Sequence, residues 1–435
     1  MLALGDAQVP RSVTKITDDE TSQHTRGTIQ VGFLTPRRKV LLLARRRYTQ
    51  PHQNKTEDVL QQLRKLRDTP LSNIGDTLES DLNFVANAIQ AGSANPSLLV
   101  AVVQEIEEIL QILPDSFGDR FWFDAQMIYE FQQSWNGDTQ RLSGTVIPKT
   151  GKAWGHESVF VTSTSANERI KSINLIHLPG QDKLSDVDLL TYPFICHELA
   201  HNLFYFDDNE FVVRFRRALD NYLGNLRLRG IADQGEAKAK SLKLIQEIDD
   251  LWSPTLNHKN WAHEMAMDIT ALWACGPAYL AAFQDEIEEQ SKNPYLIEQR
   301  HPPYAVRARA LFIASQKLGW DQHSSGIKEV GKKWRQSPWG NGLDNRYIAL
   351  TDPKLTDACL ACALAACESY RLPRCTTSDI ERISLMLTRG ETPDFGLDLL
   401  LAAWLRKEQQ DEGSFAAWEQ DTLRALVKSL TPLSP

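Results

Sequence analysis

Two histidines enclose a glutamate in the run His197-Glu198-Leu199-Ala200-His201. Residues four apart on an α-helix differ by about 40° around the axis and rise about 6 Å, so both imidazoles would face one point. Two imidazole nitrogens at that spacing suit one tetrahedral zinc ion, which predicts His197 and His201 as zinc ligands. Glu198 would lie beside the metal, where it could take a proton from a zinc-bound water and return it to a leaving amine.

The residues around this motif are largely apolar, which predicts that the histidines are buried. Buried histidines need polar partners, and a metal ion supplies them. The alternative is a pair of core histidines satisfied by hydrogen bonds alone. The apolar residues are Val187, Leu190, Phe194, Ile195, Leu199, Leu203 and Phe204.

A catalytic zinc ion takes a third protein ligand and keeps one position open. The metzincin layout would use Asp207, but it requires glycine for a sharp turn where this chain has Phe204. A nearby carboxylate, Asp208 or Glu210, would require the helix to end abruptly. We therefore favour a ligand from a separate helical segment, Glu264.

Glu264 is followed one helical turn later by Asp268, on the same predicted helix face. There Asp268 could accept the N–H of a ligating histidine and hold its orientation. The neighbours are apolar, which argues against a solvated acidic stripe. His263 and His258 remain competing ligands. The apolar neighbours are Ala262, Met265, Ile269, Ala271 and Leu272.

A third block, H-P-P-Y-A-V-R, runs from His301 to Arg307 directly before a predicted helix. Hydrolysis through a tetrahedral intermediate benefits from a positive or hydrogen-bonding group near the developing oxyanion. His301, Tyr304 and Arg307 all have suitable chemistry, so we predict that they contribute to catalysis.

The three blocks H-E-x-x-H, E-x-x-x-D and H-P-x-x-x-x-R occur in that order over roughly residues 185–315. This order resembles the gluzincin zinc peptidases, and within them the HtpX-like and prenyl-protein endopeptidase group. Members of that group commonly carry membrane helices, whereas this sequence predicts none. We therefore do not expect their membrane substrates here. The resemblance implies that His197, His201 and Glu264 bind zinc and that Glu198 is the general base. It also implies that Asp268 orients a ligand, and that His301 and Arg307 support the substrate or the transition state.

Four regions of different texture follow one another along the chain. Residues 1–53 are polar and broken by prolines, which predicts an irregular N-terminal arm. Residues 54–140 carry apolar side chains at helical spacing, which predicts a helical N-terminal domain. Residues 141–320 would form a zincin-like catalytic core, and residues 321–435 a helical C-terminal region.

The catalytic core is expected to contain both strands and helices. Runs of β-branched residues separated by Gly, Pro, Ser and Asn predict a small sheet over residues 142–180. The helix with H-E-x-x-H is expected over about 186–206, and the helix with Glu264 over about 258–275. The predicted fold class is therefore α+β and predominantly helical.

The composition bounds the class of protein and its partners. The 435 residues are 42% hydrophobic and 24% charged, with a net charge of -8. These values are typical of a globular protein, and the acidic balance argues against nucleic acid as a partner. The sequence offers no apolar run near the roughly 18 residues of a membrane-spanning helix, and its N-terminus does not resemble a signal peptide. We therefore expect a cytoplasmic protein.

Two other clusters invite a functional interpretation. Trp320, Trp334 and Trp339 alternate with lysines, as in some single-strand binding surfaces, but no recognisable nucleic-acid fold accompanies them. Four cysteines crowd into or near an Ala-rich predicted helix, which favours helix packing over a structural metal or a redox pair. These cysteines are Cys359, Cys362, Cys367 and Cys375.

The expected function is zinc-dependent cleavage of an intracellular protein or peptide, in which Glu198 assists the attack of zinc-bound water. The helical regions on either side would select the substrate or bind a regulatory partner. Two alternatives stay open: a non-catalytic, zinc-stabilised interaction protein and a zinc hydrolase of a non-peptide substrate. Loss of cleavage in Glu198→Gln with zinc retained would favour the peptidase.

Overall fold

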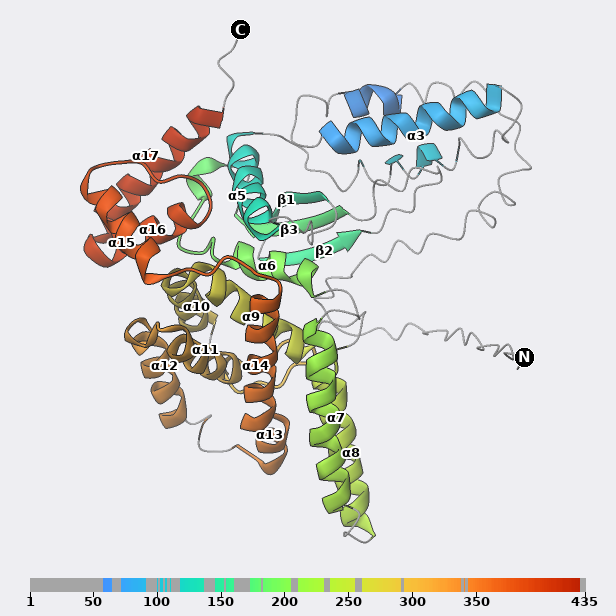
Figure 1. The fold of residues 1–435 in the computed structure, drawn as a ribbon, viewed down its shortest axis with the longest axis vertical. Coiled ribbons are helices and arrows are strands. Elements are labelled where there is room, and N and C mark those ends of the chain that lie inside the picture. The colour runs from blue at the N-terminus through green and yellow to red at the C-terminus, as the bar shows by residue number, and fades with distance from the viewer. Residues whose placement is uncertain are drawn as a thin grey trace, which may run out of the picture.

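The computed structural model is predominantly helical and contains a small sheet (Figure 1), which confirms the α+β fold class in this coarse form. Several segments that the sequence analysis considered, including the N-terminal arm at 1–53, lie outside the described residues. The structure describes residues 58–64, 72–90, 100, 102–104, 106–107, 110, 118–136, 145–151, 154–159, 173–180, 183–204, 210–230, 235–254, 260–290, 293–337, 340 and 343–430.

Helices both precede and follow the sheet along the sequence. Helical residues at 58–64 precede it, as do α3 (Ser72–Gln90) and α5 (Asp119–Asn136), among the parts of the chain that the structure describes. Among the described residues, no helix is both long and apolar enough to cross a membrane. The helices that follow the sheet are α6 (Phe194–Leu203), α7 (Glu210–Gly230), α8 (Glu236–Trp252), α9 (Trp261–Cys275), α10 (Pro277–Gln290), α11 (Tyr304–Leu318), α12 (Ser325–Gln336), α13 (Asn345–Leu350), α14 (Pro353–Ser369), α15 (Thr377–Thr388), α16 (Leu397–Gln409) and α17 (Glu412–Leu430).

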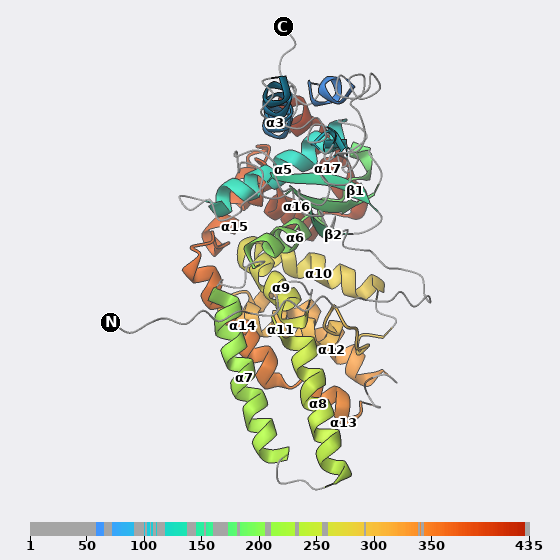
Figure 2. The same ribbon diagram turned by 90° about the vertical axis from the view of Figure 1, so that its right-hand side faces the viewer.

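The sheet has β3 (Ile173–Pro179) at its centre, parallel to β1 (Thr145–Gly151) and antiparallel to β2 (Gly155–Val159). Successive side chains of a strand point to opposite faces. Leu175 accordingly packs with the N-terminal helical residues, whereas Ile176 faces the main core. Because α6 packs against β2 and β3, the sheet lies between the N-terminal helices and the helix with H-E-x-x-H (Figure 2).

Helix α6 begins at Phe194, later than the expected start at about residue 186. The segment before it forms a short 3-10 turn, Leu184–Asp186, and a loop that ends at Pro193. Proline has no backbone N–H and is tolerated only in the first turn of a helix, so the α-helix cannot extend back through Pro193. The motif-bearing helix is therefore short, and the turn before it fixes where it starts.

Helix α9 lies at the centre of the main core. Asn260 caps its start by accepting a hydrogen bond of 3.1 Å from the His263 N–H, and Gly276 ends it with a φ of 54°. The helix thus begins at Trp261, slightly after the expected residue 258. All of its residues apart from His263 are buried, as is typical of a helix enclosed on every side. Helices α6, α8, α10, α11, α14 and α16 pack against it.

Helix α14 packs against α9 through small side chains. Cys359, Ala363 and Cys367 are fully buried, and the Cys359 thiol contacts the backbone carbonyl of Ala262 in α9 at 3.4 Å. Cys362 is half-buried. All six cysteines are free thiols, and among the described residues the side chains that could hold a metal ion include no cysteine. The cysteine-rich helix is therefore part of the packing around α9.

Helices α7 and α8 form a hairpin that extends away from the rest of the chain (Figures 1 and 2). Its base is held by aromatic contacts, such as Phe215 of α7 with Trp252 of α8 at 6.1 Å between ring centroids. The base therefore joins the core through which α9 runs, while the far end extends away from it.

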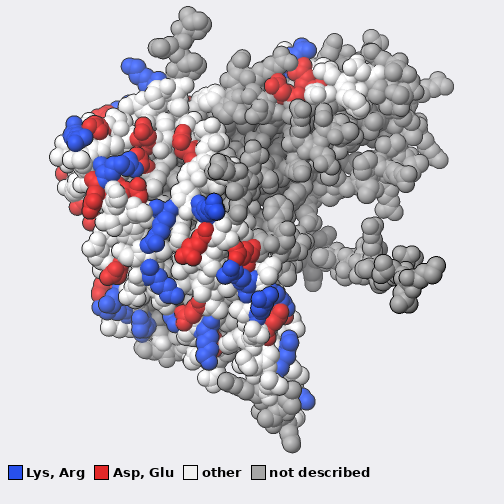
Figure 3. Space-filling model, viewed as in Figure 1, with Lys and Arg blue, Asp and Glu red and all other residues white. Residues whose placement is uncertain are grey.

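The surface carries charges of both signs. Figure 3 shows acidic and basic side chains interspersed over the described part of one face. Trp320 and Trp334 are buried, whereas base stacking requires exposed rings. Trp339 lies outside the described residues. The two described tryptophans of the aromatic and basic cluster thus belong to the core.

Candidate metal centre

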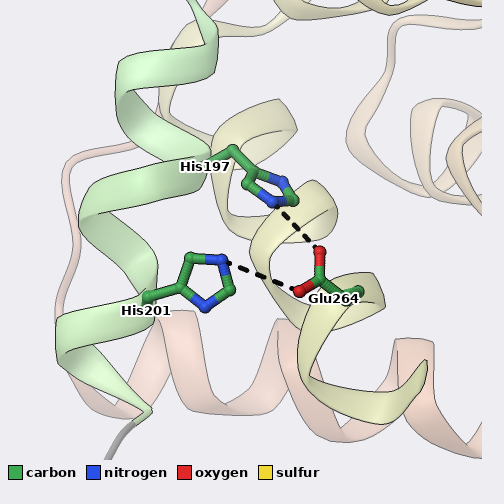
Figure 4. A group of neighbouring side chains, drawn as sticks. All are labelled: His197, His201 and Glu264. Atoms are coloured by element: carbon green, nitrogen blue, oxygen red, sulfur yellow. Dashed lines mark ion pairs between the residues drawn. The ribbon is translucent and has the colours of Figure 1, made fainter. Parts of the chain in front are cut away.

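Helices α6 and α9 bring His197, His201 and Glu264 together (Figure 4), and we call these three residues the ligand cluster. One ligand atom from each lies within 4.8 Å of the other two. His197 Nε2 is 3.4 Å from Glu264 Oε2, and His201 Nε2 is 3.9 Å from Glu264 Oε1. Two ligands about 2.05 Å from one ion at the tetrahedral angle lie about 3.3 Å apart, so these separations fit a shared metal ion.

The surroundings of the ligand cluster also fit a cation. The exposed fraction is 5% for His197 and 2% for Glu264. Among the described residues, the buried Glu264 Oε1 has no hydrogen-bond partner. A buried carboxylate oxygen in this state is costly, and a metal ion would satisfy it. Two imidazoles and one carboxylate are ligands that zinc and other divalent transition metals accept.

Asp268 contacts the ring nitrogen of His197 that faces away from the ligand cluster. His197 Nδ1 is 2.9 Å from Asp268 Oδ1, while Arg307 donates from Nε to Oδ2 and from its terminal nitrogen to Oδ1, each at 2.7 Å. Burial alone would raise the pKa of Asp268, but Arg307 and His197 lower it to about 2. The ionised carboxylate favours a proton on His197 Nδ1, which leaves the Nε2 lone pair directed at the ligand cluster.

The carboxylates around His197 attract positive charge strongly. Burial lowers the pKa of the His197 imidazole, yet its bonds to Asp268 and Glu264 raise it to about 9. The pKa of Glu264 lies well below its usual range, because the neighbouring His301, His197 and His201 outweigh the effect of burial. The same carboxylates therefore stabilise a proton on His197 and would stabilise a metal ion in the ligand cluster.

Glu198 lies next to the ligand cluster without belonging to it. The side chain is buried, and its Oε2 is 3.8 Å from His201 Nε2. His301 approaches from the loop before α11, with Nε2 at 3.7 Å from Glu264 Oε2. Its side chain is 46% exposed, so His301 lies on the solvent side of the ligand cluster.

Arg307 and Tyr304 pack against each other at the start of α11. Arg307 is buried, with its guanidinium 5.1 Å from the Phe283 ring centroid and 5.6 Å from that of Tyr304. Its hydrogen bonds go to Asp268. The Tyr304 hydroxyl donates to Glu286 at 3.3 Å. Arg307 therefore contacts Asp268, the carboxylate that in turn contacts His197.

Tyr279 is a member of the site that the sequence analysis did not identify. Its hydroxyl donates to Asp268 Oδ1 at 2.6 Å and lies 3.5 Å from His197 Nδ1. The residue stands early in α10, just after the turn at Gly276. Its apolar neighbours in the sequence indicate only a core aromatic, so local pattern alone could not have identified it.

The competing ligands have other surroundings or lie outside the described residues. Glu210 begins α7 and pairs with Arg214. The His263 ring lies 6.1 Å from that of Phe211. Neither belongs to the group that could hold a metal ion. The candidates outside the described residues are Asp207, Asp208 and His258.

No protein-family model, no curated protein and no solved structure matches this chain. The function therefore has to be inferred from the chemistry of the site. Its features are a buried three-residue ligand cluster, an adjacent glutamate and a half-exposed histidine.

Proposed function

We propose that this protein is a zinc-dependent endopeptidase that cleaves a protein or peptide substrate. The observation that carries the proposal is the convergence of His197, His201 and Glu264 from two packed helices, with Glu198 beside them. A metal held only for stability needs no adjacent carboxylate outside the ligand set. A hydrolytic site does need such a group, because a proton must be moved during the reaction.

In this proposal each residue has one role. A bound zinc ion would polarise the peptide carbonyl and lower the pKa of a water molecule. Glu198 takes the proton of the attacking water and passes it to the leaving nitrogen. His301, on the solvent side, donates a hydrogen bond to the oxygen on which negative charge develops. Asp268 keeps the His197 ring oriented, and Arg307 keeps Asp268 ionised.

The proposal includes a zincin-like core of the gluzincin kind, in which one helix supplies two histidines and a second supplies the glutamate. The placement of the ligand cluster on α6 and α9 supports this. The regions outside the core, including the hairpin of α7 and α8, would select the substrate or bind a regulatory partner. We place this activity in the cytoplasm.

The decisive experiment compares the wild-type chain with Glu198→Gln after zinc loading. Cell protein extracts are exposed to each enzyme, and newly formed protein termini are counted by mass spectrometry. A lost general base lowers the rate by about 10²- to 10⁴-fold, so new termini should disappear while bound zinc remains. Glu419→Gln, another buried glutamate but on α17, is the matched control and should keep the activity.

The other outcomes point to different functions. Absence of new termini with both enzymes would contradict the peptidase, and hydrolysis of a non-peptide amide or ester would then be tested. An unchanged cellular function in Glu198→Gln would indicate a non-catalytic, zinc-stabilised interaction protein.

A further inference from the structure

The Tyr279 hydroxyl is enclosed at the junction of three helices. Tyr279 comes from α10, its acceptor Asp268 from α9, and the nearby His197 from α6. The side chain is fully buried. Its ring lies 5.5 Å from that of Phe194 and 6.3 Å from that of Phe283, measured between centroids. These contacts hold the ring, so the hydroxyl has little freedom to leave Asp268.

Three donors converge on one oxygen of Asp268. Oδ1 accepts from Tyr279 at 2.6 Å and from Arg307 at 2.7 Å, and it lies 2.9 Å from His197 Nδ1. Arg307 binds both oxygens of the Asp268 carboxylate and so fixes its plane. The Tyr279 hydroxyl adds a contact to Oδ1 from a different helix, α10, and further holds the oxygen that lies 2.9 Å from His197 Nδ1.

The hydroxyl is available as a donor. The Tyr279 oxygen lies 2.6 Å from Asp268 Oδ1, and a contact this short between two oxygens requires a proton between them, which the phenol supplies. Partners that orient a ligating histidine in this way typically change metal affinity by about 10- to 100-fold when removed.

We propose that Tyr279 is a positioning residue for the metal centre, acting through Asp268 Oδ1 to fix the direction in which His197 Nε2 faces the ligand cluster. This inference rests on the proposed metal site, but not on peptide cleavage. It assigns Tyr279 neither contact with the metal nor contact with a substrate.

The same chain provides a matched control. Tyr192 is also fully buried, and its hydroxyl donates to Asp124 Oδ1 at 2.5 Å. Asp124 is in turn bound to Arg120, as Asp268 is bound to Arg307. Tyr192→Phe therefore removes a hydroxyl of the same kind, but one that is bound to Asp124 instead of Asp268. A purely structural effect would be common to Tyr192→Phe and Tyr279→Phe.

The experiment measures metal binding in chains that all carry Glu198→Gln, so no cleavage is needed. The zinc dissociation constant is obtained by competition with a chromophoric chelator, and the absorption spectrum of Co²⁺ reports the geometry of the ligands. Tyr279→Phe should bind zinc about tenfold more weakly, at the lower end of the usual range, and should alter the cobalt spectrum. Tyr192→Phe should leave both unchanged.

The effect must also depend on Asp268. In an Asp268→Asn background, Tyr279→Phe should change zinc affinity by less than about twofold, because the oxygen it positions no longer belongs to a carboxylate. An undiminished effect in that background would overturn the inference.

Three further outcomes would overturn it. One is equal zinc affinity and an equal cobalt spectrum in Tyr279→Phe and its parent. Another is an equal loss of affinity in Tyr192→Phe. The third is failure of Tyr279→Phe alone to fold, which would assign the hydroxyl to the fold itself. If the parent binds no metal at all, the metal site and the proposed function fail together, and that result is distinct from the other three.

Discussion

The structure contains two buried networks of the same composition, one between α5 and the turn before α6 and the other between α9, α10 and α11. In each network, an arginine and a tyrosine donate hydrogen bonds to the carboxylate of a buried aspartate. Asp268 also contacts His197, a member of the ligand cluster. The networks are Arg120 with Asp124 and Tyr192, and Arg307 with Asp268 and Tyr279.

The first network fixes the entry to α6. Arg120 and Asp124 lie one turn apart on α5, Arg120 also reaches the Pro179 carbonyl at the end of β3, and Tyr192 belongs to the turn before α6. The second network acts from within the core and ends on His197. The comparison teaches that a buried Arg–Asp–Tyr set identifies no function by itself, and that the group it holds decides its role.

Removing the aspartate of either network should lower stability more than the other changes do. It should also distinguish the two networks by their effect on zinc affinity. Asp124→Ala and Asp268→Ala each leave a buried arginine without its carboxylate, which costs about 3–5 kcal/mol. Urea unfolding of the metal-free proteins should show similar losses. Zinc titration should show a further loss of affinity in Asp268→Ala alone. Equal loss in both variants would mean that general stability, rather than the contact with His197, sets the affinity.

Zinc removal should come next. A ligand that binds only the folded state at a hundred times its dissociation constant stabilises that state by about 2.7 kcal/mol. Melting with zinc and with a chelator should reveal this increment in the wild type and in Tyr192→Phe. His201→Ala, which removes a member of the ligand cluster, should lose it. An increment that survives in His201→Ala would point to another binding place.

A third buried carboxylate, Glu419, shows by comparison how an arginine changes the pKa of a buried acid. Glu419 accepts a hydrogen bond of 2.8 Å from the Leu189 N–H in the segment before α6. Burial and, to a smaller extent, Asp188 raise the pKa of Glu419, the Leu189 N–H lowers it, and the net result is a pKa of about 7. Asp268, whose carboxylate is bound to Arg307, has a pKa of about 2 instead.

The sign of the resulting pH dependence follows directly. Between pH 4.5 and about 7 the unfolded chain has released the Glu419 proton while the folded chain still holds it, so stability falls as the pH rises. Glu419→Gln should remove this fall, and its stability relative to the wild type should rise by about 1–3 kcal/mol over the window. Urea midpoints at pH 4.5 and 7.5 test it. A parallel pH dependence in both proteins would contradict it.

The tyrosines should show the smallest difference in stability. Tyr192→Phe and Tyr279→Phe each remove one buried hydrogen bond, which is worth about 1 kcal/mol. We expect nearly equal shifts in the denaturation midpoint of the metal-free proteins. A Tyr279→Phe shift several times larger would show that its hydroxyl stabilises the fold more than its counterpart does.

The sequence was most informative where the chemistry is local. The pairing of His197 with His201 follows from helical spacing, and Glu264 followed from its apolar surroundings and the resemblance to gluzincins. Asp268 was placed one turn from Glu264 by the same periodicity. The spacings of His197 with His201 and of Glu264 with Asp268 needed only the geometry of one helix at a time.

The rest depended on contacts between distant segments. Tyr279 and Asp268 meet only because a glycine turn folds α10 back against α9. The contacts of Arg307 with Phe283 and Asp268 could not be predicted from its own motif, because both partners come from distant segments. The late start of α6 was readable from Pro193, but the apolar pattern on both sides favoured a longer helix.

The enclosure of α9 has a consequence for the order in which the chain is assembled during synthesis. Cys359 of α14 packs on Ala262 across a separation of 97 residues. The glutamate-bearing helix leaves the ribosome well before the helix that covers it. Until α14 and α16 follow, one side of α9 stays open to water and to small ions. The face of α9 that carries Ala262 and Thr270, which contact Cys359 and Cys367 of α14, therefore becomes enclosed only late in synthesis.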